Sequence, residues 1–444
     1  MKNYILIVLC IFFAGCATKA LNYEPQEIKS DYNATWQYNF KIAELDNLIN
    51  LALKNNEDIA TATLNLHQAM LRAGLNKADL FPTPSGSLGA SSAKNIKEGG
   101  ASSRSFSSSL SLGWELDVFG RIFDIYESSR FSALATSFDL SELRQSIVNS
   151  VISEYFGLLY TNEIMTIIEQ NIQNMTKMHE LVKLKVELGR EEPLALAQSE
   201  QNLLNLYNSQ NSAKKELETS IEILKNLTRT TFIPTTKMSD VALPQINEEL
   251  DLLENNGTIS FSWLERIQNR PDISRAIAGL NAGFYDYRAT AKDFLPRISL
   301  GGSLSASDDK RTHAYNFSML SGNLNISLPF LDFWRLNEYL KISEDEFNKL
   351  RLNYQKTLQN AINEAVKFAA FYENDNASLA NQEQIVSQRE KILFIYEQKY
   401  NAGRVEFRDY LMAQNDLLSA QNALLNNKYQ LINDIIGFYK ASAY

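Results

Sequence analysis

The stretch KDFLPRISLGGSLSAS (Lys292–Ser307) decides the fold, because the chain contains a second version of it. Residues Ala78–Ala93 read ADLFPTPSGSLGASSA, with the same order of an acidic residue, two apolar residues, a proline, and alternating small and apolar residues. Pro82 and Pro296 occupy matching positions at an offset of 214 residues. Alternation of this kind is typical of a β-strand with two different faces. The chain is therefore predicted to contain the same strand twice.

The offset of 214 residues holds along the whole chain, apart from a one-residue slip near Asp117 and Asp332. It aligns Asp58 with Asp272, Ile59 with Ile273, Leu110 with Leu324, Gly189-Arg190 with Gly403-Arg404, Leu203-Leu204 with Leu417-Leu418, and Ile221 with Ile435. One long period predicts a duplicated unit of about half the chain, not a solenoid of short repeats. Each unit is predicted to hold a helix (Glu44–Lys77 or Ile273–Lys292), two strands, and two long helices that meet at a glycine.

The composition limits the function classes. The 444 residues are 45% hydrophobic, which is enough to build a core, and the net charge of −9 argues against nucleic-acid binding. The only cysteines are Cys10 and Cys16, so the body of the chain has neither a disulfide nor a cysteine metal site.

The first residues predict a removable signal. The apolar run Tyr4–Ala14 is too short to cross a bilayer as a helix. The sequence FAGC (residues 13–16) resembles a bacterial lipobox, in which the cysteine becomes the lipidated N-terminus. This resemblance implies a signal peptide over residues 1–15 and a covalent lipid on Cys16, and Ala17 after the cysteine implies the outer membrane. An ordinary secretory signal with an incidental cysteine is the alternative.

The longest tracts of the chain predict continuous helices. No proline occurs between Ser85 and Glu192 or after Pro329, and no glycine occurs between Gly322 and Gly403. A helix of about 66 residues would be roughly 100 Å long, too long for a globule of this mass. We therefore expect long helices that pack along each other as coiled-coil-like hairpins, with one polar side facing water.

Two runs alternate between apolar and polar residues with a period of two. In the first unit the run extends from Phe106 to Val118, and in the second unit the apolar positions are Leu324, Ile326, Leu328 and Phe330. Each run is about ten residues long, which is the length of a strand that crosses an outer membrane. An apolar outer face and an inner face of Ser, Asn and Gly fit a barrel with a wet lumen. The alternative is a soluble sandwich with one solvated face.

Two units supply four membrane strands, which leave exposed edges and cannot enclose a lumen. Association into a closed ring of identical protomers is the expected solution.

The chain resembles the TolC-like outer membrane efflux proteins, in particular the lipoprotein branch that serves RND-type multidrug pumps. Three stretches carry the resemblance: LDNLINLALKNNEDIATA (Leu45–Ala62), which follows Trp36, NRPDISRAIAGLNAGFYDYRATAKDFLPRISLGGSL (Asn269–Leu304), and YNAGRVEFRDYLMAQNDLLSAQ (Tyr400–Gln421). The resemblance covers nearly the whole mature chain.

The resemblance implies a mainly α protein with a small β part. Each protomer would hold two long helical hairpins and four membrane strands, and a homotrimer would form a 12-stranded barrel continuous with a periplasmic helical barrel. It also implies an outer-membrane location and two further partners, a periplasmic adaptor protein and an inner-membrane RND-type pump. Aromatic residues at the strand ends, namely Trp114, Phe119, Phe333 and Trp334, are predicted to anchor the membrane interface.

These expectations divide the chain into five parts. Residues 1–15 are the signal peptide, residues 16–41 form an extended segment, and residues 42–229 form the first repeat. Residues 230–258 connect the repeats, and residues 259–444 form the second repeat. The polar runs Ala93–Arg104 and Asp308–Ala314 are predicted to be extracellular loops.

The reversals of the long hairpins are candidate docking tips. They comprise Leu188, Gly189 and Arg190 in the first unit, and Ala402, Gly403 and Arg404 in the second. Glycine there supplies a left-handed helix cap. In the family these tips contact the adaptor, and arginine replaces the usual apolar residue after each glycine, so an adaptor with acidic partners is expected.

Gate candidates follow the second tip. The family closes its tunnel with rings of acidic side chains, but the usual acidic position is Met412 here. Asp409 and Asp416 lie on either side of it, and Arg408 is a candidate partner for a ring of like charges. Solvated surface charges are the alternative for each acid.

Enzyme chemistry has little support in the sequence. The three histidines are scattered, the eight methionines do not cluster, and no phosphate-binding motif is present. We therefore predict no enzyme activity, no metal site and no cofactor apart from the lipid. The expected function is a passive exit duct for drugs and small toxic compounds. Type I protein secretion, metal export, or a structural surface coiled-coil lipoprotein are the alternatives.

Overall fold

The computed structural model describes residues 21–26, 28, 39–94, 102–244, 246 and 261–442. The predicted signal peptide, Cys16 and most of the 16–41 segment lie outside these residues, as do parts of the first loop and of the connector. The chain divides into two compact units. Unit 1 comprises Met1–Lys29, Ala62–Asp139 and Asp272–Thr357, and unit 2 comprises Ser30–Thr61, Leu140–Pro271 and Leu358–Tyr444.

Within the described part of the chain, no helix combines the length and the apolar composition that crossing a membrane requires.

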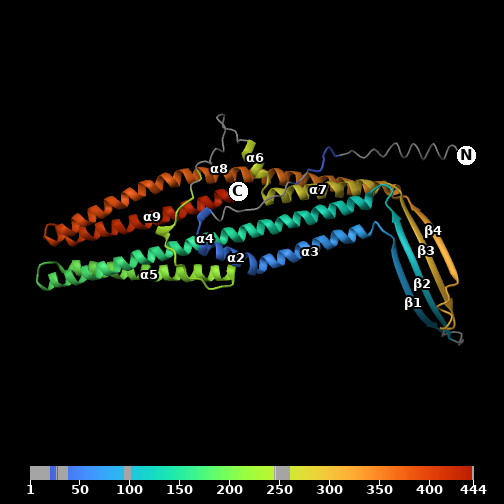
Figure 1. The fold of residues 1–444 in the computed structure, drawn as a ribbon, viewed down its shortest axis with the longest axis horizontal. Coiled ribbons are helices and arrows are strands. Elements are labelled where there is room, and N and C mark those ends of the chain that lie inside the picture. The colour runs from blue at the N-terminus through green and yellow to red at the C-terminus, as the bar shows by residue number, and fades with distance from the viewer. Residues whose placement is uncertain are drawn as a thin grey trace. The chain divides into compact units, whose positions relative to one another are not determined.

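Unit 1 contains one antiparallel sheet with its strands in chain order (Figure 1). The strands are β1 (Thr83–Ala93), β2 (Ser103–Leu116), β3 (Arg297–Asp308) and β4 (Met319–Ser327). The two repeats meet at the β2–β3 pair. Among the described residues β1 and β4 each pair on one side only, so the sheet has two open edges.

The predicted alternation along the strands is confirmed. Serine hydroxyls face each other across the strands on one side of the sheet, with 2.7 Å between Ser85 and Ser111 and 2.8 Å between Ser303 and Ser321. The other side carries large exposed apolar side chains, which are Leu88, Leu110, Leu112, Leu300, Leu304, Leu320, Leu324 and Ile326. The sheet therefore has one hydroxyl-lined face and one apolar face.

The ends of two predicted strands are wrong. Leu328 and Phe330 lie beyond β4, because Pro329 has no N–H to continue the ladder and begins a 3-10 turn instead. Val118 lies beyond β2, and its N–H donates to the carbonyl of Leu116 in a tight turn.

The turn after β2 begins a long helix, α4 (Arg121–Glu187). The carboxylate of Asp117 accepts hydrogen bonds from the N–H groups of Ile122 and Phe123, at 2.9 and 2.8 Å, and so caps the helix. One turn later, the fully buried Asp124 forms ion pairs with Lys292 and Arg288 of α7 (Pro271–Lys292). Buried charges are tolerated when they are paired in this way.

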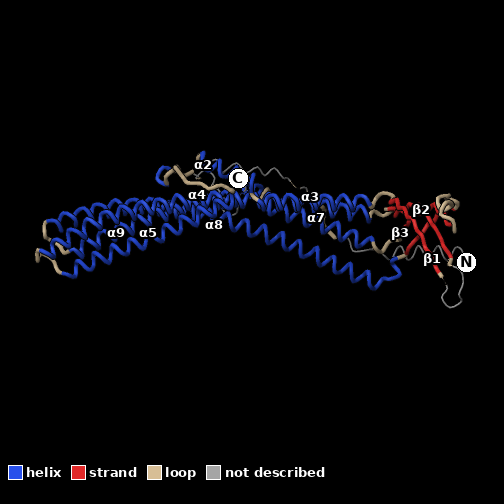
Figure 2. The backbone as a smooth tube through the Cα atoms, turned by 90° about the horizontal axis from the view of Figure 1, so that it is seen from below, coloured by secondary structure: helices blue, strands red, loops and turns tan. Residues whose placement is uncertain are grey.

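Unit 2 is built from two helical hairpins that lie side by side (Figure 2). The first pairs the part of α4 from Leu140 onward with α5 (Pro193–Thr228), and the second pairs the part of α8 (Phe333–Asn401) from Leu358 onward with α9 (Phe407–Ser442). The prediction of two long hairpins is confirmed. The helix α2 (Ala43–Asn55) packs against α5, and α6 (Phe261–Gln268) packs against α9.

The helix predicted over Glu44–Lys77 is in fact two helices, α2 and α3 (Glu57–Ala78). They are separated by Asn56, whose backbone is extended. Its side-chain oxygen accepts hydrogen bonds from the N–H groups of Asp58 and Ile59, which caps α3.

Candidate functional site: the hairpin tips

The first tip is a Schellman turn that ends α4. Gly189 has a φ of 66°, and its N–H donates to the carbonyl of Val186 at 2.9 Å. The N–H of Arg190 donates to the carbonyl of Lys185 at 2.8 Å. These two bonds satisfy carbonyls that the end of the helix leaves free, and the positive φ explains why the sequence has glycine there.

The second tip repeats the same turn at the end of α8. Gly403 has a φ of 70° and donates to the carbonyl of Tyr400, and Arg404 donates to the carbonyl of Lys399. The two tip loops lie at the same end of unit 2 (Figures 1 and 2).

The predicted tip residues are all exposed to solvent. Leu188 is 59% exposed, and Leu184 and Leu194 beside it are 52% and 61% exposed. The side chains of Arg190 and Arg404 are also exposed, one on each tip. The tips therefore present two guanidinium groups and a small apolar patch, which is a surface suited to another protein.

A buried cluster joins the two hairpins close to the tips. All four long helices contribute to it, through Met175, Met178 and Val182 of α4, Ala195 and Leu206 of α5, Tyr400 of α8, and Phe407, Tyr410 and Leu411 of α9. The hairpins are therefore held together by apolar packing just above the exposed turns.

Tyr400 of this cluster contacts two charged residues of the first hairpin. The ammonium group of Lys185 lies 3.5 Å from the centre of its ring, and its hydroxyl lies 3.5 Å from Oε2 of Glu191. Burial raises the pKa of Tyr400 and the charge of Glu191 raises it further, while burial lowers the pKa of Lys185. A cation–π contact of this kind is stronger when it is partly removed from water.

The gate candidates occupy the first turns of α9. Asp416 forms an ion pair with Arg389 of α8, with 2.7 Å between Nη1 and Oδ2. Met412 is 60% exposed, Arg408 is exposed, and Asp409 is half-buried. Asp416 thus forms its ion pair with the other helix of its own hairpin. Met412, which lies between Asp409 and Asp416 in the sequence, presents an exposed apolar side chain.

The predicted interface anchors lie at the ends of the strands in unit 1. Trp334 is 82% exposed, and Phe119 and Phe333 are 40% and 48% exposed. Trp114 is half-buried, and its indole N–H donates to the carbonyl of Leu80 at 3.0 Å. Trp334 is the residue of this set with most surface available to a lipid interface.

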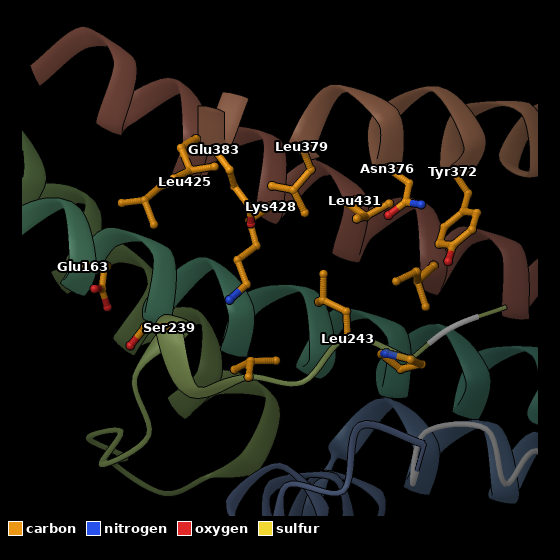
Figure 3. A pocket seen from close by; sticks show the side chains of 14 residues that line it. Glu163, Ser239, Leu243, Tyr372, Asn376, Leu379, Glu383, Leu425, Lys428 and Leu431 are labelled. Carbon is orange, nitrogen blue, oxygen red and sulfur yellow. The ribbon is translucent and has the colours of Figure 1, made fainter. Parts of the chain in front are cut away.

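Unit 2 also contains a cavity of about 570 Å³ between α4, the connector, α8 and α9 (Figure 3). Its wall is about equally polar and apolar, and Lys428 extends into it with Glu163 and Glu383 on neighbouring helices. The ammonium group of Lys428 donates to the carbonyl of Met238 at 2.7 Å. Burial lowers the pKa of Lys428, although the charges of Glu163, Glu383 and Asp240 oppose the shift. This lysine fastens the connector to α9.

Sequence reasoning missed Lys185, Arg389 and Tyr400. Each acts on a partner from another helix, so its role depends on which residues face each other across the hairpins. The constant offset between the two repeats of the sequence locates the tips, but it does not predict these side-chain pairs. Among the described residues there is no group of three or more His, Cys, Asp or Glu side chains placed to hold a metal ion.

The chain is duplicated, its sheet has one apolar and one hydroxyl-lined face, and its strands are long enough to cross a membrane. Together with the long hairpins that end in exposed turns, these features are typical of an outer-membrane channel. Residues 48–228 and 265–443 match the family model described as outer membrane efflux protein, and the chain belongs to this family. The resemblance found in the sequence is confirmed.

Similar proteins match most or all of the length of the chain. Toxin and drug export protein A of Aggregatibacter actinomycetemcomitans is 30% identical over 453 residues, which is 100% of this chain and 97% of that protein. Cation efflux system protein CusC of Escherichia coli (strain K12) is 25% identical over 394 residues, covering 87% of this chain and 83% of that protein. The crystal structure of the Campylobacter jejuni CmeC outer membrane channel has a TM-score of 0.80 at 25% identity, covering 96% of this chain and 90% of that chain.

The protein is therefore an efflux channel of the Gram-negative outer membrane that extends into the periplasm. The family consists of channel and transport proteins, which trimerise and work with periplasmic adaptors and inner-membrane pumps. This assignment leaves the alternative of a structural surface coiled coil without support.

Proposed function

We propose that this channel is the exit duct for drugs and other small toxic compounds, delivered by an inner-membrane RND-type pump through a periplasmic adaptor. Three copies would close the open edges of β1 and β4 into one 12-stranded barrel, with the serine face lining the lumen. A lipid on Cys16 would add a membrane anchor. The observation that carries the proposal is the pair of matching tips, each presenting an exposed arginine.

The two arginines define the adaptor surface in this proposal. Arg190 and Arg404 occupy the same position of two Schellman turns at one end of unit 2. Guanidinium groups bind carboxylates in a bidentate manner, so the adaptor would present acidic side chains to both tips. Asp409, Met412 and Asp416 would lie just inside the entrance and act as its gate, with Arg389 restraining Asp416.

The first test is the susceptibility of a deletion strain to antibiotics, dyes, bile salts and metal ions, with the intact gene restored in parallel. We expect hypersensitivity to many compounds that the intact gene cures. An Arg190→Glu/Arg404→Glu variant should fail to cure it while reaching the outer membrane at the normal level. A Lys214→Glu/Lys215→Glu variant is the matched control, because it makes the same charge change at exposed positions of α5 away from the tip.

The outcomes separate the cargo from the architecture. Sensitivity to metal ions alone would replace drugs by metals as the cargo, and full complementation by the arginine variant would overturn the docking surface. Protein export is the second candidate, because a relative that matches the whole length of the chain is named as a toxin and drug export protein. Loss of a secreted protein from the medium, with unchanged drug susceptibility, would favour it.

A further inference from the structure

Asp434 is a buried acid in the interior of the second hairpin. It lies on α9, its side chain is 7% exposed, and its Oδ2 atom is buried without a hydrogen-bond donor among the described residues. A carboxylate in that position is costly, because nothing replaces the water that would otherwise solvate the charge. A buried oxygen of this kind needs either a cation or a proton.

The group that faces Asp434 is a second acid. Asp375 of α8 is half-buried, and its carboxyl group lies within hydrogen-bonding reach of Asp434. Two contacts on either side hold the helices together here: Phe368 packs against Gly437, and the side-chain amide of Gln382 donates to the carbonyl of Ala420 at 3.0 Å. Two carboxylates held this close cannot both stay ionised at low cost.

Other charged groups nearby do not neutralise this pair. Lys367 of α8 favours the ionised form of Asp434, but its own side chain is exposed. Lys440, the next basic residue of α9, lies 3.7 Å from Glu364, which also binds Arg270 at 2.9 Å. Lys440 and Arg270 therefore form their ion pairs with Glu364.

The other elements beside this part of α9 supply both charged and uncharged groups. Arg270 donates to the carbonyl of Ala441 at 3.2 Å, and Glu163 of α4 lines the same cavity as Lys428 and Ile435. On α4, the hydroxyl of Ser153 donates to Asn433 at 3.1 Å. On α6, the ring of Trp263 packs against Phe438. Among the described residues none of these groups donates a hydrogen bond to Oδ2 of Asp434, so a proton shared with Asp375 would offset the cost of burying it.

The duplication shows that the fold does not require acids at this place. Counted from the tip glycines, the positions equivalent to Asp375 and Asp434 in the first hairpin are Thr161 and Ser220, and both are buried. Ile435 follows Asp434 and Ile221 follows Ser220, which supports this alignment of the two hairpins. Small neutral side chains thus replace both carboxyl groups in the first hairpin, where the side chain of Ser220 is hydrogen-bonded to Glu154 of α4.

We propose that Asp375 and Asp434 form a proton-binding pair that holds one proton between them and joins α8 to α9 by a carboxyl–carboxylate hydrogen bond. The proton is taken from the surrounding water, which converts one carboxylate of the pair to a carboxylic acid. Burial, together with the hydrogen bond and the charge of Asp375, raises the pKa of Asp434 to about 7. The pair therefore changes its charge near neutral pH, whereas Thr161 and Ser220, at the equivalent positions of the first hairpin, carry no carboxyl group.

The sign of the pH effect follows from this raised pKa. Below about pH 4 the folded and unfolded chains both carry the proton, and above about pH 7 neither does. Between these values the folded chain alone retains it, so the stability contributed by the pair is lost as the pH rises through about 7. The second hairpin should thus loosen on going from mildly acidic to mildly basic medium.

The test uses the full-length protein in detergent or lipid and two readouts. The first is the infrared band of a protonated carboxylic acid at neutral pH, which should disappear in both Asp434→Asn and Asp375→Asn. The second is the difference in melting temperature between each variant and the wild type, measured from about pH 5 to about pH 8.5. The amide of Asp434→Asn donates permanently to Asp375, so this variant should gain stability over the wild type as the pH rises.

A Glu373→Gln variant is the matched control, because Glu373 is exposed on the same helix two residues from Asp375. It should keep the infrared band and follow the wild type at every pH. The proposal is overturned if the band persists in both asparagine variants, or if their melting temperatures differ from the wild type by the same amount across the pH range. Asp375→Asn alone decides the matter if Asp434→Asn does not fold.

Discussion

The tip glycines are the residues whose conformation the sequence predicts most directly. Gly189 and Gly403 have positive φ values and no heavy atom within 4 Å of the place where a Cβ would stand. The obstacle to any other residue is therefore the backbone conformation alone and not a lack of space.

Replacing Gly189 by alanine should destabilise the hairpin by about 1 kcal/mol, because a left-handed backbone is unfavourable for a residue with a Cβ. Thermal melting of the purified protein measures this. Gly74→Ala is the control, since Gly74 lies inside α3 with open space around it, and it should be neutral or stabilising by about 0.5–1 kcal/mol. Equal effects of the two substitutions would contradict the role assigned to the turn.

Glu44 fixes the connector to α2. Its carboxylate accepts hydrogen bonds from the N–H and hydroxyl of Thr235, from Thr236 at 3.1 Å, and from Tyr155 at 3.2 Å. Burial raises the pKa of Glu44, but these hydrogen bonds outweigh it and hold the pKa below its ordinary value. A lowered pKa stabilises the fold above the unfolded pKa and loses this contribution as the pH falls through the folded one.

Glu44→Gln should lower the free energy of unfolding by about 1–2 kcal/mol at neutral pH, because the amide keeps one acceptor oxygen and turns the other into a donor. The loss should shrink as the pH is lowered below about 4.5, where the wild-type carboxylate is also protonated. Melting at several pH values checks this. Glu222→Gln, at an exposed ion pair with Lys225, should change little, and a pH-independent loss in Glu44→Gln would exclude the charged carboxylate as the cause.

At the scale of elements, the sheet has a face for lipid and a face for water. Leu304 pairs with Leu110 and Leu320 on the apolar side, whereas the neighbouring Ser303 pairs with Ser111 and Ser321 on the hydroxyl side. Substitutions at these two adjacent residues of one strand therefore probe the two opposite faces of the sheet.

Leu304→Arg should block stable insertion into the outer membrane, since an arginine on the lipid face of a barrel costs about 2–4 kcal/mol near the middle of the bilayer. Ser303→Arg should insert normally and alter conductance, because it places the charge in the lumen. Membrane fractionation and the yield of folded protein measure both effects. Normal insertion of Leu304→Arg would show that the apolar side does not face lipid.

The sequence predicts these elements well where the period or a breaker residue is strong. The alternation in β2 and the proline-free tracts of α4 and α8 gave the strands and hairpins. The break at Asn56 was missed because asparagine is not a strong helix breaker, and it acts here through its side-chain cap. The alternation of apolar residues continues to Phe330, and it therefore predicts a strand that extends past Ser327. The strand ends at Ser327 because Pro329 has no N–H to continue the ladder.

The sequence predicts the turns of the candidate site, but it does not predict which side chains pair across the helices. Glycine followed by arginine in both repeats marks the tips without any knowledge of the fold. Arg389 with Asp416, and Asp375 with Asp434, join α8 to α9, so they depend on the register between two helices. That register is set by packing of the whole hairpin, and no local signal in the sequence reports it.

At the scale of the whole molecule, the duplication explains why a single copy is incomplete. Each repeat contributes two strands, and the resulting sheet ends in two unpaired edges among the described residues. Unpaired edges inside a membrane are not tolerated, because lipid offers no hydrogen-bond partners. A closed assembly of several copies removes both edges of every copy.

The measurement that tests this account most directly is single-channel conductance of the purified full-length protein in a planar lipid bilayer, with its mass in detergent determined in parallel. Because three copies would enclose one lumen, we predict a trimer whose insertion produces one conductance step. That step should be altered by Ser303→Arg. A monomer, or a trimer that closes in three equal and independent steps, would contradict the shared channel, since each copy would then conduct alone.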